Sequence, residues 1–480
     1  VRINPRAKRY EMTKNGLRQY HALAPEERRT VRKWMCTADG QEAKSTLIEK
    51  LILLCTLKTA TLDPAGMGVE MEGGKPGWYD ALNGLPGLLG SSMAESCELA
   101  RLLRFTIEAL ETHEGQVDLY EEAAALLSEV DQILSSQQES YARWDRLNTV
   151  KEAYRANTEI GYQGKRTAVG RKALSAMLSR LEGAVQEGIE AACGFGGGVI
   201  PTYFTFTASA VQSTPEGPMP TELQPEAMPL FLEGPVHYLK LSNGTEKKRA
   251  LHELVRKSPL YDEKLHMYKV NASLQNVSFE VGRAKAFTPG WLENESIWLH
   301  MEYKYLLELL KSGLYEEFGE ALHDAAVPFL NWEQYGRSPL ENVSFLASSA
   351  NPDPAVHGRG FVARLSGSTA EFLQIWQLMF FGERPFRLEN GRLCLELSPC
   401  IPAYLMPESG RVEAVFLGSV RVVYNAPGCK ALTPGQTKAV SYELIYQNGE
   451  PEQTEGGLLP EAQARAVRDG KVKELRVTMR

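Results

Sequence analysis

Apolar side chains recur at helical spacing through most of the first 193 residues. A spacing of three or four positions places such side chains on one face of a helix, and it is found in residues 41–59, 99–110, 118–158 and 169–192. Ser91 or Ser92 can cap the second of these helices, with Glu95 in its first turn. The first part of the chain is therefore predicted to be a series of helices joined by loops.

The pattern changes at Gly194. The stretch GFGGGVIPTYFTFTAS alternates apolar and hydroxyl residues, as a strand does, and proline-rich sequence follows to about residue 235. Helical spacing returns near residues 246–257, in IWLHMEYKYLLELLKSG and LYEEFGEALHDAA, and at residues 368–381. From about residue 384 the sequence favours strands, as in RLCLELSP, RVEAVFLGSVRVVYN and KAVSYELIYQNG.

These patterns predict a mainly α protein. Helices in pairs, with polar loops at one end, fit an (α/α)6-barrel-type helical toroid that could be incomplete in this chain. A β-rich insertion would interrupt the helices, and a C-terminal antiparallel β domain would follow them. The predicted parts are a helical part over 1–193, a mixed β and loop insertion over 194–290, a second helical part over 291–383 and a β-rich domain over 384–480.

Charge and composition narrow the classes of function. The formal net charge of −7 argues against nucleic acid as a main partner, because a surface that follows phosphates needs a basic excess. No apolar run reaches the length of a membrane span, and no charged-then-apolar leader is present. The seven cysteines are scattered without a CxxC pair, which favours reduced thiols in a cytoplasmic protein and no metal site.

Three stretches of the sequence contain candidate functional residues, and their order along the chain is informative: Gly77–Gly84 (GWYDALNG), Ser366–Ala370 (SGSTA) and Leu397–Pro402 (LSPCIP). Together they resemble the acid loop, the phosphate loop and the segment before the C-terminal β region of inverting β-glucan phosphorylases of the cellobiose phosphorylase superfamily. The departure is Tyr79, which stands where cellobiose phosphorylase has Asn. The wider stretch PGWYDALNGLPGLLGSSMAES is most similar to the β-1,3-oligoglucan phosphorylase branch.

The resemblance implies phosphorolysis of a β-linked gluco-oligosaccharide, with Asp80 as the general acid. The chemistry agrees, because inverting cleavage needs an acid on the leaving oxygen and a nucleophile on the opposite face. Inorganic phosphate is then the co-substrate and nucleophile, and no metal or organic cofactor is expected. Trp78 and Tyr79 would stack on sugar rings and lower the dielectric around the acid, which favours its protonated form.

The expected phosphate site centres on Gly367, Ser368 and Thr369, where the free backbone N–H groups at the start of a helix favour an anion. His357 and Arg359 lie just upstream, and an Arg fork suits bidentate phosphate contact. Taken without the resemblance, the same residues read as an ordinary helix cap in a solvated loop. The resemblance also places a phosphate-binding histidine near a helix start. His300 is the candidate, although Trp298 could occupy the equivalent place.

Further polar and aromatic residues could line sugar subsites, or could equally serve packing: Asn83, Trp291, Glu293, Asn294, Tyr335 and Arg337. One rival function is an inverting hydrolase, with Asp63, Glu70 or Glu72 as its base. A second rival is a non-catalytic carbohydrate-binding subunit. In the related enzymes the acid follows an N-terminal β-sandwich and the first barrel helices, whereas here it comes at position 80 of a chain that starts with Val1. We therefore expect either a homodimer, as in the family, or association with a missing N-terminal part.

Overall fold

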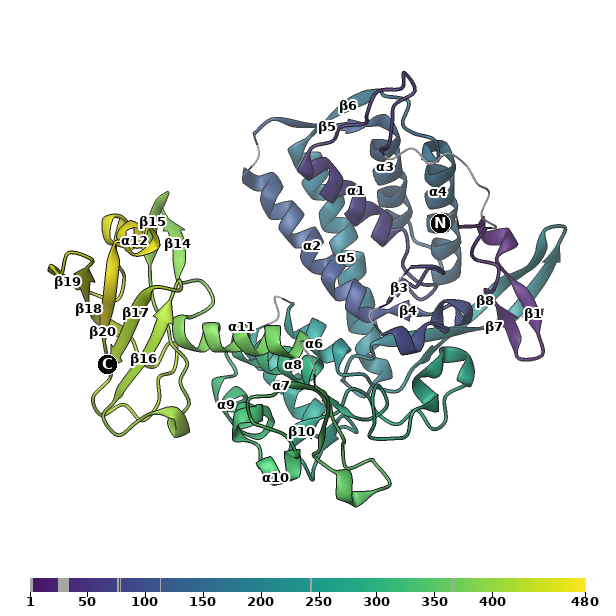
Figure 1. The fold of residues 1–480 in the computed structure, drawn as a ribbon. Coiled ribbons are helices and arrows are strands. Elements are labelled where there is room, and N and C mark those ends of the chain that lie inside the picture. The colour runs from purple at the N-terminus through teal and green to yellow at the C-terminus, as the bar shows by residue number, and fades with distance from the viewer. Residues whose placement is uncertain are drawn as a thin grey trace.

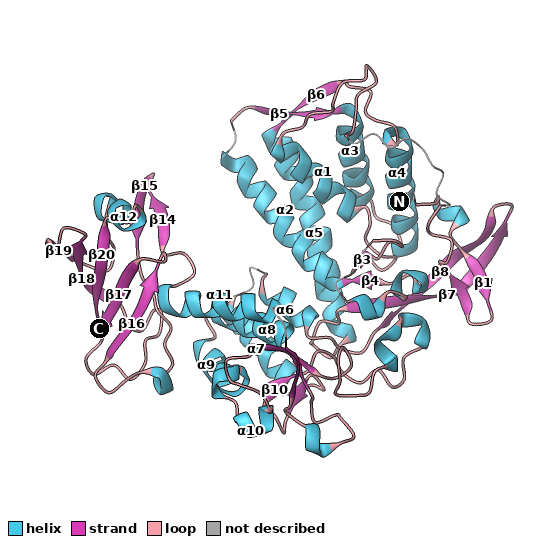
Figure 2. Cartoon of the chain, in the orientation of Figure 1, coloured by secondary structure: helices cyan, strands magenta, loops and turns pink. Residues whose placement is uncertain are grey.

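The computed structural model describes residues 3–24, 34–75, 77, 79–112, 114–241, 244–363 and 367–480. The chain forms two groups of helices and a C-terminal β domain (Figure 1). Helices dominate both groups, whereas the last hundred residues are mainly strands (Figure 2). The twelve α-helices of the described part therefore belong to a mixed helix and strand fold rather than to a purely helical one.

The first group of helices follows the predicted apolar spacing closely. It comprises α1 (Leu47–Thr59), α2 (Met93–Thr112), α3 (Glu121–Ser135), α4 (Ser140–Thr158) and α5 (Arg171–Phe195). The Ser92 hydroxyl accepts a hydrogen bond from the Glu95 amide at 3.5 Å, as the predicted cap requires. The long helix predicted over 118–158 is broken, because the Ser136 hydroxyl hydrogen-bonds the carbonyl of Ile133 and ends α3 there.

Short strands connect these helices to the rest of the molecule. Strands β5 (Gln116–Tyr120) and β6 (Arg166–Gly170) pair in antiparallel fashion, and so do β1 (Glu11–Thr13) and β2 (Gly16–Arg18). A four-stranded sheet has the order β3 (Val69–Glu70), β4 (Ser91–Ser92), β7 (Tyr203–Thr214) and β8 (Gly217–Ala227). The alternating sequence after Gly194 contributes to β7, and the proline-rich sequence forms β8, its partner in a long hairpin. The sheet holds both ends of the Glu70–Ser91 segment that carries Asp80.

The second group of helices surrounds a small three-stranded sheet. Its helices are α6 (Glu233–Leu239), α7 (Thr245–Arg256), α8 (Leu299–Lys311), α9 (Tyr315–Ala325), α10 (Trp332–Tyr335) and α11 (Gly367–Phe381). The three-stranded sheet has the order β11 (Ile297–Trp298), β12 (Val343–Leu346) and β13 (Gly360–Ala363), and β9 (Tyr261–Asp262) pairs separately with β10 (Met267–Tyr268). The polar sequence over 331–367 gave no strand signal, yet all four residues of β12 are buried between β11 and β13.

The C-terminal domain corrects one prediction. Strands β14 (Phe386–Glu389) and β15 (Arg392–Leu395) form a hairpin beside a five-stranded sheet of order β16-β17-β20-β18-β19, whose members are β16 (Arg411–Phe416), β17 (Val420–Asn425), β18 (Ala439–Tyr446), β19 (Pro451–Glu455) and β20 (Val472–Met479). This sheet is mixed and not antiparallel, because β20 pairs with β17 in parallel and with β18 in antiparallel fashion. A strand inserted between two opposed neighbours must run parallel to one of them, and α12 (Glu461–Arg468) provides the connection back to that central position.

Two large hydrophobic cores and two small clusters contain most of the buried apolar residues of the described part of the chain. Leu89 and Met93 belong to the core of the first group, whereas Tyr79, Leu82 and Leu85 belong to the core shared by the second group and the C-terminal domain. The segment around Asp80 therefore passes from one core to the other. The described helices do not close into a ring of six pairs (Figure 1), and none of them is long and apolar enough to span a bilayer.

Short 3-10 helices occur mainly in the loops. They are η1 (Arg6–Lys8), η2 (Asp80–Leu82), η3 (Leu85–Leu88), η4 (Phe279–Val281), η5 (Arg283–Ala286), η6 (Val327–Phe329), η7 (Pro354–Val356) and η8 (Ala403–Leu405).

Candidate active site

Asp80 is the first residue of η2, in a loop that is locked to the segment 279–286. The Gly84 amide donates a hydrogen bond to the carbonyl of Val281 at 3.0 Å. A Cβ at Gly84 would lie 1.9 Å from the Glu280 carbonyl oxygen, so only glycine allows this close approach. Asp80 and Asn83 are both exposed at the surface of the loop, while Trp78 lies outside the described residues.

Tyr79 does not serve the predicted sugar stacking, because it is buried with 3% of its surface exposed. Its ring packs edge-on against Tyr203, Phe231 and Trp298, with centroids 6.2, 5.5 and 5.4 Å away. Tyr79 therefore anchors the acid loop in the core. The expectation that Tyr79 lines a low-dielectric sugar pocket around the acid is wrong, since its ring faces the core and Asp80 faces solvent.

Glu293 is the carboxyl group that lies beside Asp80. It accepts a hydrogen bond from the Ala81 amide, one residue past the acid. Burial raises the pKa of Glu293, and the negative charge of Asp80 raises it further, against the opposing effects of the Ala81 amide and Arg283. Its Oε2 and the Oδ1 of the neighbouring Asn294 are buried and have no hydrogen-bond partner among the described residues. One open acceptor thus belongs to the carboxyl group beside Asp80, and the other belongs to the residue that follows it.

The loop that carries Glu293 is strained and firmly tied. Leu292 and Glu295 adopt positive φ angles of 52° and 57°, which is costly for residues with a side chain. The Asn271 side chain donates to the Glu293 carbonyl at 3.1 Å and accepts from the Glu295 amide at 2.5 Å. Trp291 stacks on Phe361 with centroids 3.6 Å apart, so its ring is used in packing. Local strain of this kind often accompanies functional groups.

His300 meets the predicted phosphate loop. A Cβ at Gly367 would lie 2.0 Å from Cε1 of His300, so the imidazole rests directly on the first residue of α11. The Trp298 ring lies between His300, at 6.3 Å, and Tyr79, at 5.4 Å, and so connects this point to the acid loop. The Ser368 side chain is fully buried and donates to the Val343 carbonyl at 3.3 Å, which turns its hydroxyl away from the surface. Thr369 is half-buried in the same turn.

A cavity of about 330 Å³ borders the acid loop. Gly77 of the acid loop lines it, together with Tyr203, Glu233, His237 and Lys304. Lys304 lies four residues after His300 on α8, hence on the same face of that helix. Burial raises the pKa of Glu233, whose carboxylate accepts from the Tyr203 hydroxyl at 2.6 Å. A larger cavity of about 700 Å³ lies between α9 and residues 400–404 of the LSPCIP region, away from Asp80.

Four predicted site residues lie elsewhere. His357 and Arg359 precede the first residue of β13, whereas Ser368 follows its last residue, Ala363, which pairs with Val343. The strand between them spans roughly 10 Å. The His357 ring contacts Lys264 Nζ at 2.7 Å and the Asn351 carbonyl at 2.8 Å.

The remaining two of the four support the neighbouring loop. Tyr335 is 1% exposed and donates its hydroxyl to the Glu341 carbonyl, and Arg337 donates to the Gly360 carbonyl at 3.0 Å.

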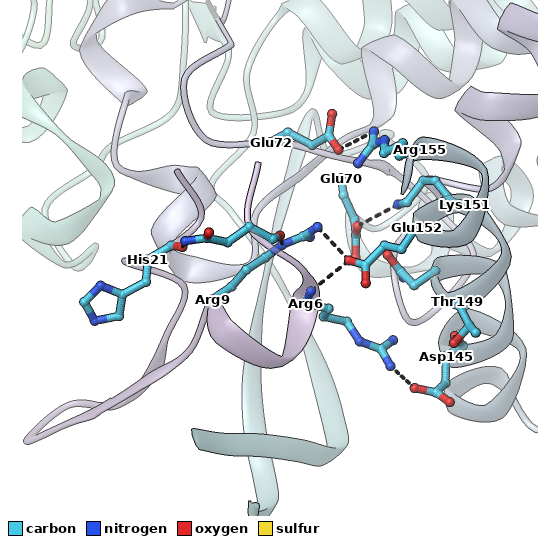
Figure 3. Close-up of polar contacts among 12 residues, drawn as sticks. Arg6, Arg9, His21, Glu70, Glu72, Asp145, Thr149, Lys151, Glu152 and Arg155 are labelled. Atoms are coloured by element: carbon cyan, nitrogen blue, oxygen red, sulfur yellow. Dashed lines mark hydrogen bonds and ion pairs between the residues drawn. The ribbon is translucent and has the colours of Figure 1, made fainter. Parts of the chain in front are cut away.

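The three carboxylates considered as hydrolytic bases have other partners. Asp63 accepts four hydrogen bonds, from the amides of residues 65, 67 and 68 and from the Ser91 hydroxyl. Glu70 accepts from Trp144 Nε1 at 2.5 Å and lies 3.8 Å from Lys151, while Glu72 pairs with Arg155 at 2.6 Å (Figure 3). These contacts tie the three carboxylates to the first group of helices and to its strands.

Sequence reasoning missed two charged residues beside His300. Glu371 Oε1 lies 3.7 Å from His300 Nε2. The positive charges of Lys304 and Lys311 act on Glu371 as well. Their spacing in the sequence could have indicated both residues. Lys304 follows His300 by four positions and Glu371 follows Gly367 by four, so each pair shares a helix face.

Comparisons with known proteins leave the chain without a family. No family model and no curated protein matches it. Among solved structures, the GH63 mannosylglycerate hydrolase of Thermus thermophilus, in complex with glucose, aligns with 69% of this chain and 92% of its own length, at 13% identity and a TM-score of 0.25. A TM-score this low supports neither a shared fold nor a shared activity.

Proposed function

We propose that this protein cleaves β-linked gluco-oligosaccharides, with β-1,3 linkages as the first candidates, by phosphorolysis with inversion. Asp80 donates its proton to the glycosidic oxygen as the bond to the anomeric carbon breaks. An oxygen of inorganic phosphate attacks that carbon from the opposite face. The products are α-glucose 1-phosphate and a shortened glucan, and Asp80 is left as a carboxylate that regains a proton from solvent.

The observation that carries this proposal is the pair of open acceptors at Glu293 and Asn294. Sugar hydroxyls are donors, and a buried acceptor without a partner gains most from one. The negative charge of Asp80 also acts on Glu293 and helps to raise its pKa, so the two carboxyl groups lie in one polar cluster. A sugar that covers Asp80 would exclude water and favour its neutral, proton-donating form.

The anion site is assigned to His300, the backbone of Gly367 and Ser368, and the Thr369 hydroxyl. Support comes from the contact of the His300 ring with Gly367 and from Lys304 on the same face of α8. The Ser368 hydroxyl, His357 and Arg359 are left out of this assignment because of their positions. No metal or organic cofactor enters the scheme, and a homodimer remains a prediction.

One observation favours an inverting hydrolase instead. Glu371 places a carboxylate against His300, where phosphate would bind. A hydrolase needs such a carboxylate to activate water, at about 6.5–9.5 Å from the acid. Glu293 is less suited to activate water, because it accepts a hydrogen bond from the Ala81 amide of the acid loop and therefore lies next to Asp80 and not opposite it.

Products distinguish the two reactions. Purified protein and an Asp80→Asn variant are incubated with laminari-oligosaccharides, with and without inorganic phosphate, and α-glucose 1-phosphate and free glucose are measured. We expect sugar phosphate only when phosphate is present, and a loss of at least about 100-fold in the variant. Release of free glucose at the same rate without phosphate would instead identify a hydrolase, and full activity of the Asp80→Asn variant would remove Asp80 from the mechanism.

A further inference from the structure

The ion pair of His300 and Glu371 lies in the centre of the anion site proposed above. The two side chains approach to 3.7 Å and are 21% and 17% exposed, respectively. Since Glu371 follows Gly367 by one helical turn, both residues face the same side of α11. The His300 ring rests on Gly367 and reaches Glu371 from there. Any anion bound to His300 at this turn therefore lies beside Glu371.

Glu371 is kept in its charged form. Burial raises its pKa, but the hydrogen bond to His300 and the positive charges of Lys304, His300 and Lys311 outweigh burial, so that the pKa is lowered. The charged groups that act on this carboxylate among the described residues include His300, Lys304 and Lys311 of α8, and Lys304 also acts on Glu233 of α6. The cations that would attract phosphate are thus already partly neutralised.

We propose that Glu371 is a built-in competitor of phosphate: it holds His300 when the site is empty, and phosphate must displace it. The inference rests on the proposed phosphorolysis and adds the residue that sets phosphate affinity. Two anions held a few ångströms apart at a partly buried site repel strongly. Glu371 therefore weakens phosphate binding without touching the sugar or the leaving oxygen.

The test compares inorganic phosphate binding by calorimetry in the wild-type protein and in Glu371→Gln. The amide keeps the size of the side chain and removes its charge. We expect phosphate to bind about tenfold more tightly, and the KM for phosphate to fall about as much while kcat changes less. The matched control is Glu316→Gln, an exposed glutamate of α9 that removes the same charge at a distance from the site. Its phosphate affinity should stay within about twofold of the wild type.

A second variant separates charge from packing. Glu371→Asp keeps the charge with a shorter reach, and its phosphate affinity should lie between those of the wild type and Glu371→Gln. Unchanged or weaker phosphate binding in Glu371→Gln would overturn the inference and leave phosphorolysis standing, as long as the wild type binds phosphate. If the wild type binds no phosphate and cleaves glucan without it, both proposals fail. Loss of that cleavage in Glu371→Gln would then identify Glu371 as a hydrolytic base.

Discussion

Glu293 and Glu72 are both largely shielded carboxylates, and their surroundings shift their pKa values in opposite directions. Burial raises the pKa of each, yet Arg155, Lys75 and Lys151 bring that of Glu72 down to about 2. At Glu293 the pKa is raised, because the Ala81 amide and Arg283 offset burial and the charge of Asp80 only in part. Among the described residues no ion pair includes Glu293, whereas Glu72 pairs with Arg155 at 2.6 Å (Figure 3).

The difference teaches what each carboxylate is suited for. A carboxylate surrounded by cations is charged at all ordinary pH values, and its ion pairs stabilise the contact between the segments that they join. A carboxylate that lacks an ion pair, has an open oxygen and faces a like charge can take up a proton or a ligand donor. Glu72 thus belongs to the architecture of the first group of helices. Glu293 has the properties expected of the proposed site.

The largest expected effect separates these roles directly. Glu293→Gln removes the negative charge beside Asp80 and replaces the open acceptor for a sugar hydroxyl by an N–H donor, while the amide oxygen can still accept from the Ala81 amide. We expect kcat/KM to fall at least about 100-fold and the melting temperature to change by less than about 2 °C. In Glu72→Gln, which breaks an ion pair whose Arg155 side chain is 33% exposed, the free energy of unfolding should fall by about 2 kcal/mol.

Kinetics at a temperature where both variants are folded, together with thermal unfolding, measure the two effects. Activity per folded molecule should be retained in Glu72→Gln. The contrast breaks if Glu293→Gln is active but unstable, because Glu293 would then be a structural residue like Glu72.

A smaller effect is expected from a pair of glycine substitutions. The added Cβ of Gly367→Ala would lie 2.0 Å from the His300 ring, so the ring must leave its place on α11. We expect the KM for phosphate to rise about tenfold, with little change in the KM for the sugar, in steady-state kinetics with each substrate varied. Gly183→Ala is the control: it lies inside α5 with nothing within 4 Å, and should stabilise the protein by up to about 1 kcal/mol. Unaltered phosphate kinetics in Gly367→Ala would remove His300 from the anion site.

Helices with strong apolar spacing could be predicted from the sequence, and so could the loop that carries Asp80. The stretches over 246–257 and 368–381 correspond to α7 and α11, because tertiary packing reinforced a clear local pattern. The pairing of His300 with the Gly367 turn was expected from two separate motifs and is seen in the structure. That these motifs bind phosphate stays a prediction.

The rest depends on contacts between residues far apart in the chain. Tyr79 follows a tryptophan and precedes the acid, and nothing local tells that it faces the core while Asp80 faces solvent. The strand β12 is short and lies in polar sequence, so its burial comes only from its neighbours β11 and β13. Arg359 and Ser368 are close in sequence, and the strand between them is what keeps them apart.

The smallest expected effect is the loss of stability at acid pH that the ion pairs of Glu72 predict. Because the pKa of Glu72 is about 2 in the folded protein, below its ordinary value of about 4.5, its stabilising contribution is complete above pH 4.5 and is lost as the pH falls toward 2. Urea unfolding at pH 6 and pH 3.5 should therefore show the wild type losing about 1 kcal/mol more than Glu72→Gln over that interval. Parallel losses in both proteins would mean that Arg155 and Lys151 do not hold Glu72 in its charged form, and the contrast with Glu293 would then lie in the open acceptor alone.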